Sequence, residues 1–437
     1  MSARGAPSSE SSGASESVRS LQRRTVRVLA AAQVLTGVGV GAGVAAGSLL
    51  VAELTGTEGL AGLAQTAGVV GAAVAAGPLA WMSVRSGRRI GLVTGLWIAA
   101  AGALVVIGAS VLEAVPLVLL GTFGVGVASA VGLQARYAAS DLAAPAHVGR
   151  DLSMVVWATT IGAVLGPNLM QPSADFADAI GLPPLSGPYL LTASSIALAA
   201  LLVAGMLRPD PLLAARDLAR ASEADDYLEP RQRGMLAELT HGARVVRSAP
   251  GASLAVAAMA VGHVVMVMVM VMTPVHMQHV DVTLQVVGLV ISVHILGMFA
   301  FSPVVGWLAD RRGSVAVISG GVVVLALATM IAGTASGDSV VQLGIGLFLL
   351  GLGWSATLVG GSALLSTSVP DETRPAAQGV GDTVMNLAAA VGGVMAGVIV
   401  YTASYGWLNA AAALCLVPLA GALLRRRVAG AVRTPVR

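Results

Sequence analysis

The chain has 437 residues, of which 56% are hydrophobic and only 11% are charged. Soluble globular domains carry about 25% charged residues, so this composition excludes a soluble fold. The formal net charge of +3 gives no reason to expect nucleic acid as a partner, because in a membrane chain the placement of charge matters more than its sum.

Apolar runs of membrane-spanning length recur along the whole chain. A Ser-, Ala- and Gly-rich start predicts a disordered tail over 1–27, and the first apolar run is long enough to be a retained span instead of a cleaved signal. Twelve transmembrane helices are predicted, near 28–51, 60–84, 90–112, 115–133, 152–170, 189–207, 252–275, 286–309, 315–332, 340–364, 380–401 and 407–424.

One long polar segment, 208–251, divides these spans six and six. The predicted fold is therefore an all-α membrane protein with an N-terminal bundle (28–207), a cytoplasmic central loop (208–251), a C-terminal bundle (252–424) and a cytoplasmic tail (425–437). We expect a monomer surrounded by the lipid bilayer.

Positive charge is confined to alternate loops. The chain has no lysine, and its 25 arginines lie in the two tails, the central loop and every second short loop, where we place Arg136 as well. By the positive-inside rule this distribution predicts that both termini are cytoplasmic in a multi-pass protein of the cell (inner or plasma) membrane.

The two halves repeat each other. The loop after span two reads Arg85-Ser-Gly87-Arg88, the loop after span eight reads Asp310-Arg311-Arg-Gly313, and the two glycines are 226 positions apart. Proline residues before spans five and eleven are 225 apart, which indicates an internal repeat of the kind that builds a central cavity.

The stretch Gly306-Trp-Leu-Ala-Asp310-Arg311-Arg-Gly313 resembles the signature loop of the major facilitator superfamily. The resemblance covers the whole chain and implies a secondary transporter that works by alternating access. It also implies a conformational lock in which the Asp caps a helix end and the Arg residues neutralise carbonyl ends. The lock residues it assigns are Asp310, Arg311, Gly313, Arg85, Gly87 and Arg88. Val84 stands where the first half would carry its Asp.

Span seven contains an unusual run of methionines. His263, Met266 and Met270 share one helix face, and span eight contains the pair His294 and Met298. Counted from the cytoplasmic ends, Met266 matches His294 in depth and His263 matches Met298, so these four residues lie near mid-membrane, where transporters bind substrate. Imidazole and thioether groups form a soft ligand set that suits Cu(I) as cargo.

These spacings resemble the CcoA-type copper importers, with Met266, Met270, His294 and Met298 as the implied metal-binding residues. A second register would instead select Met268 and Met272. Because Met also lines promiscuous binding surfaces, a cavity for an organic substrate is an equal alternative.

Gly162-x-x-x-Gly166-Pro167 is similar to the motif of drug/proton antiporters in the same superfamily, although such spacing also serves helix packing. Asp382 is the candidate for proton coupling, with a helix-start acid as the alternative. No constellation supports an enzyme or a cofactor, and the single Cys415 excludes a disulfide within the chain.

Overall fold

The computed structural model describes residues 9–56, 62–222, 234–278 and 284–432, and over these residues its regular structure is entirely helical. The α-helices are α1 (Ser9–Thr55), α2 (Gly62–Ser86), α3 (Arg88–Val111), α4 (Val115–Ala138), α5 (Val148–Asn168), α6 (Met170–Ala179), α7 (Gly187–Met206), α8 (Pro211–Ser222), α9 (Met235–Ser248), α10 (Pro250–Gln278), α11 (Leu284–Phe299), α12 (Ser302–Arg312), α13 (Ser314–Gly333), α14 (Val340–Ser368), α15 (Arg374–Thr402) and α16 (Tyr405–Val432).

Within the described residues, twelve helical segments are long and apolar enough to cross a membrane. Six belong to the first half (α1 to α5 and α7) and six to the second half, where α11 and α12 together form one span. The predicted fold class, twelve transmembrane helices in two halves, is confirmed.

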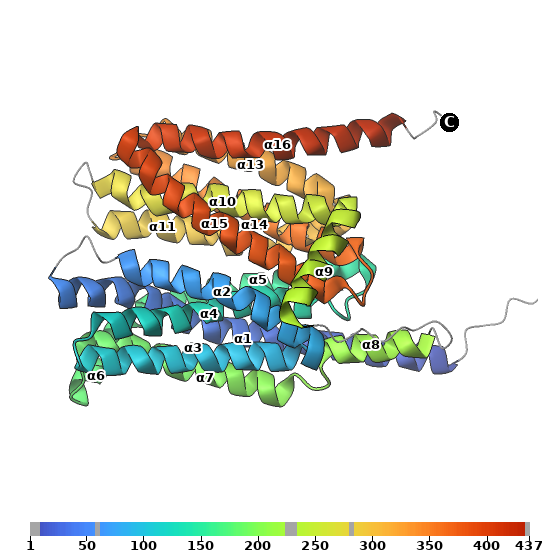
Figure 1. Cartoon of the computed structure of the whole chain (residues 1–437), viewed down its shortest axis with the longest axis horizontal. Helices are drawn as coiled ribbons and strands as arrows, with labels where there is room; N and C mark the ends of the chain where they lie inside the picture. Colours follow the sequence, from blue (N-terminus) through green and yellow to red (C-terminus); the bar gives the residue numbers. More distant parts are fainter. Residues whose placement is uncertain (1–8, 57–61, 223–233, 279–283, 433–437) are drawn as a thin grey trace, which may run out of the picture.

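The two halves lie against each other as two layers (Figure 1). Their main contacts are α2 with α15 and α5 with α12. The helices α8 and α9 lie at the end of the molecule where α2 gives way to α3 and where the C-terminus emerges (Figure 1). We call this the arginine-rich end, because the arginine-bearing loops gather there.

Small residues allow the helices of the first half to pack closely. A Cβ on Gly162 of α5 would lie 2.5 Å from the Val34 carbonyl oxygen of α1, and one on Gly166 would lie 2.6 Å from the Val38 carbonyl oxygen. The glycine motif of span five therefore serves the packing of α5 on α1.

Three expectations differ from the structure. Of the tail predicted to be disordered over 1–27, residues 9–27 continue α1, with Gln22 buried against the Ala139 carbonyl, and residues 1–8 lie outside the described part of the chain. The central loop contains α8 and α9. The helix α4 continues to Ala138, beyond the predicted end at 133, so Arg136 lies inside α4 and not in a loop, and its side chain is fully buried.

Candidate functional site

A buried ion pair joins the two halves of the molecule. Arg136 Nη2 of α4 lies 2.6 Å from Asp382 Oδ1 of α15, and both side chains are 1% exposed. The guanidinium also donates to Ser362 Oγ at 2.9 Å and lies 4.4 Å from the centre of the Tyr137 ring. Asp382 Oδ2 is buried and has no hydrogen-bond partner among the residues that the structure describes, so this carboxylate keeps a free acceptor site.

Arg136 and Ser362 are themselves 226 positions apart, the same spacing as the two loop glycines. Residues at equivalent positions of a two-fold repeat touch each other only near the axis that relates the halves. Their hydrogen bond therefore places the Arg136–Asp382 pair beside the pseudo-two-fold axis, where repeat transporters hold substrate and coupling ions.

Asp382 is well inside its helix. It follows the start of α15 at Arg374 by more than two turns and is 1% exposed. The alternative prediction of an acid at an exposed helix start does not fit this position.

The first half contributes a polar amide one turn further from the arginine-rich end. Gln33 of α1 lies against Gly132 of α4, where a Cβ would approach the Gln33 Nε2 to 2.7 Å. That amide nitrogen donates to Thr159 Oγ1 of α5 at 3.0 Å. In the second half, Asn386 follows Asp382 by one turn of α15 and donates to its carbonyl oxygen.

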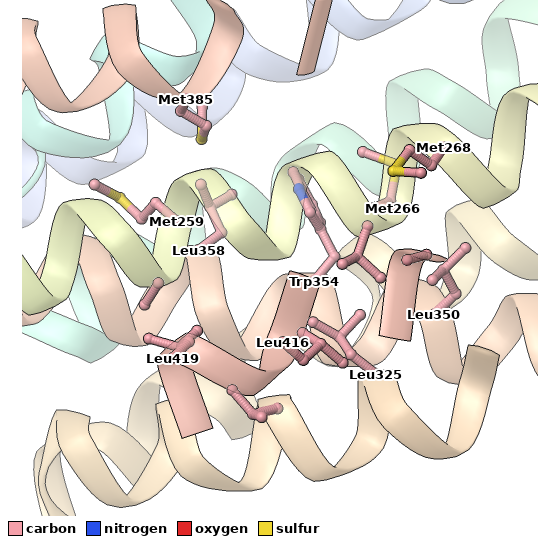
Figure 2. Packing of buried hydrophobic residues seen from close by; sticks show 14 of the residues in the cluster. Met259, Met266, Met268, Leu325, Leu350, Trp354, Leu358, Met385, Leu416 and Leu419 are labelled. Atoms are coloured by element: carbon pink, nitrogen blue, oxygen red, sulfur yellow. The ribbon is translucent and has the colours of Figure 1, made fainter. Parts of the chain in front are cut away.

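One residue on the methionine face of α10 contacts the first half. Met259 accepts a hydrogen bond from the Tyr137 hydroxyl of α4 at 3.7 Å, and residues 263, 266 and 270 continue the same face. Figure 2 shows the Trp354 indole beside α10, with Met259 on one side and Met266 on the other.

Trp354 links α10 to α11. Its indole N–H donates to His263 Nδ1 at 2.8 Å, and its ring makes an edge contact with Phe299 at 5.6 Å between centroids. Because Nδ1 accepts, neutral His263 carries its proton on Nε2 and presents a donor. His263 is partly exposed, whereas Trp354 is buried.

The predicted cargo residues occupy one core, with α14 as their common neighbour. Met266 and His294 are buried, and Met270 and Met298 are partly buried against the same apolar cluster. Both α10 and α11 pack extensively on α14 and only slightly on each other. A metal site formed by all four side chains stays a prediction.

His294 is held in one tautomer. Its Nδ1 lies 2.8 Å from the Leu347 carbonyl oxygen of α14, so Nδ1 carries the proton. Nε2 then presents a lone pair, and it is buried without a hydrogen-bond partner in the described structure. This is the arrangement that orients a histidine for metal binding.

The second-half signature loop contacts the first half. Asp310 at the end of α12 accepts hydrogen bonds from the Gly149 and Arg150 amides at 2.7 and 2.8 Å, which caps the start of α5. Arg311 is exposed and lies over the Trp307 ring, and Gly313 adopts a φ of 86°.

The first-half loop makes different contacts. Arg88 is buried and binds Asp141 through Nε at 2.8 Å and Nη2 at 3.0 Å. Burial raises the pKa of the Asp141 carboxyl, and the Arg88 guanidinium opposes that shift. Arg85 is exposed over the Trp81 ring, and Gly87 has a φ of 91°.

Three residues of this site were not predicted from the sequence: Arg136, Gln33 and Trp354. Gln33 and Trp354 were visible as a polar and a large aromatic residue in otherwise apolar spans, a pattern that favours function at membrane depth. Arg136 was assigned to a loop, and only the continuation of α4 shows its burial.

The family model for the Major Facilitator Superfamily matches residues 29–283 and 254–436 of the chain. A curated relative, the "Uncharacterized MFS-type transporter YdeG" of Bacillus subtilis (strain 168), is 39% identical over 390 residues, which cover 89% of each chain. The "Riboflavin transporter RfnT" of Brucella anthropi is 26% identical over 94% of this chain and 97% of its own.

Among solved structures, the human organic anion transporter MFSD10 matches with a TM-score of 0.71 at 18% identity, over 92% of this chain and 99% of that chain. At this level of identity the likeness shows the fold alone.

Proposed function

Because this chain belongs to the Major Facilitator Superfamily, we propose that it carries a small organic solute across the membrane by alternating access, coupled to proton movement through Asp382. The observation that carries the proposal is the buried Arg136–Asp382 pair, which joins the halves beside their pseudo-two-fold axis. We further propose that the protein works as a monomer in the cell membrane.

The pair can convert proton binding into movement of the halves. When Asp382 takes up a proton from water, an O–H bond forms and the carboxylate charge that attracts Arg136 is lost. Arg136 keeps its contacts with Ser362 and Tyr137, but the charge attraction between α4 and α15 is removed. Separation of the halves at the arginine-rich end then becomes less costly.

The residues around the pair favour an uncharged cargo. Among Asp, Glu, Lys and Arg, the twelve predicted spans contain only Asp382, and Arg136 at the end of α4 already neutralises it. A charged solute would lose its hydration without a counter-charge, whereas hydrogen-bonding groups such as Gln33 and His263 suit a neutral polar solute. The Trp354 indole adds an aromatic surface. The riboflavin transporter relative supports a planar heteroaromatic solute.

Uptake by proteoliposomes tests this proposal with a matched pair of probes. Riboflavin is uncharged, and riboflavin 5′-phosphate carries the same ring with a phosphate. We expect proton-gradient-dependent uptake of riboflavin that is at least about tenfold greater than uptake of the phosphate. Equal uptake of the two would contradict an uncharged cargo.

A substitution at Asp382 distinguishes the loss of proton coupling from the loss of transport itself. Asp382→Asn should abolish the dependence on the proton gradient and retain exchange of riboflavin across the membrane. Asp338→Asn, an exposed acid at the opposite end, is the matched control and should keep the dependence. Gradient-dependent uptake by Asp382→Asn would rule out this carboxyl as the coupling group.

Cu(I) is the second candidate cargo, and the free Nε2 of His294 favours it. If Cu(I) is carried, His294→Ala and the double change Met266→Leu with Met270→Leu should each abolish copper accumulation in cells. Leu matches Met in volume and apolarity, so a packing role predicts little change. Normal copper accumulation in both variants would leave the organic solute as the cargo.

A further inference from the structure

The signature contact of the second half cannot form in the first half. Asp310 binds the amides at positions 149 and 150 of α5. With the repeat spacing of 226, Val84 occupies the place of Asp310, and Pro375 and Ala376 of α15 occupy the places of the two amide donors.

Both partners of the equivalent contact are therefore altered. Val84 has no carboxylate to accept a hydrogen bond, and Pro375 has no backbone N–H to donate one. The carbonyl oxygen of Val84 is instead bound by Arg216 Nη1 of α8 at 2.9 Å. The change from the second-half contact therefore affects both α2, at Val84, and α15, at Pro375. This is expected if a different contact holds this side of the interface.

A buried hydrogen-bond chain crosses the interface close by. Arg88, which binds Asp141 within the first half, also donates from Nη2 to Gln378 Oε1 of α15. Gln378 in turn donates to Ser366 Oγ of α14 at 3.1 Å. Gln378 is 1% exposed and uses both ends of its amide, one toward each half.

We infer that Gln378 is a positioning residue of the transport cycle: its hydrogen bond with Arg88 replaces the aspartate lock that Val84 and Pro375 cannot form. The inference rests on the proposed alternating access but requires neither a particular cargo nor proton coupling. An amide does not gain or lose a proton near neutral pH, so this lock persists when Asp382 is protonated. The first-half lock is then broken only by separation of the helices.

Alkylation of a buried thiol reports separation of the halves without any cargo. Ser153 is fully buried between α5 and α12, on the other side of the interface from Gln378. The reporter is Ser153→Cys in a Cys415→Ser background, and the rate of its reaction with a water-soluble maleimide is measured in detergent. Gln378→Leu removes the amide at nearly constant volume and should raise this rate by about tenfold, the effect expected from loss of one hydrogen bond to a charged group.

Gln342→Leu is the matched control. Gln342 also makes two hydrogen bonds, to the Ile331 carbonyl and Thr334, but at the opposite end and within the second half. The Gln342→Leu variant should leave the alkylation rate of the Ser153→Cys reporter unchanged. An unchanged rate in Gln378→Leu, or an equal rise in Gln342→Leu, would overturn the inference.

A second variant at the same position distinguishes loss of the contact with Arg88 from general misfolding. Gln378→Glu keeps an acceptor for Arg88, so its alkylation rate should stay close to that of the parent protein. A rate as high as that of Gln378→Leu would show that the contact with Arg88 does not hold the interface. The alkylation experiment contains no cargo, so a negative result in it would not contradict proton-coupled uptake. A negative result in the uptake experiment would likewise not contradict the role of Gln378.

Discussion

Removal of one member of the Arg136–Asp382 pair should be far more damaging than removal of both. Arg136→Met leaves the Asp382 carboxylate buried with neither of its oxygens partnered, since Oδ2 already lacks a hydrogen bond. Breaking a buried pair in this way costs about 3–5 kcal/mol. Replacing both charges by apolar groups of similar size is about neutral, or stabilising by about 1–4 kcal/mol.

The test is a double-mutant cycle on thermal unfolding of the detergent-solubilised protein. Arg136→Met and Asp382→Leu should each lower the unfolding midpoint clearly, and the double variant should unfold close to the parent protein. The double variant should nevertheless show no proton-coupled uptake, because the titrating group is gone. If the two single effects simply add in the double variant, the pair is not energetically coupled and the coupling mechanism built on it fails.

Three further outcomes are expected. Gly87→Ala should destabilise the protein more than Gly313→Ala. Both glycines have a positive φ, but only at Gly87 would an added Cβ meet the Asp210 carboxylate, at 2.6 Å. Equal shifts of the unfolding midpoint in the two variants would contradict this prediction. Asp310→Asn should slow transport without reducing the amount of protein in the membrane, since it weakens the cap on α5, and normal uptake would show that the cap is dispensable. A reporter fused after Arg427 should be active only on the cytoplasmic side, and activity outside would refute the predicted orientation.

The sequence by itself determined the membrane fold. Apolar runs of spanning length, the single polar break at 208–251 and the repeat at Gly87 and Gly313 were sufficient to predict twelve helices in two halves, because the hydrophobic effect and the need to satisfy backbone polar groups in lipid act on each span separately. Asp310 was recognisable for a similar reason, since its role depends on a local motif at a helix end.

The residues that meet across the interface were decided by tertiary structure. Helical periodicity gives the face on which a residue lies, but it does not say which neighbouring helix that face meets. Matching depth alone therefore could not show that α11, which carries His294, and α10, which carries Met266, both pack on α14 and only slightly on each other. The bonds of Arg136 with Asp382 and of Arg88 with Gln378 join residues more than 240 positions apart, and only the packing of one half on the other brings them together.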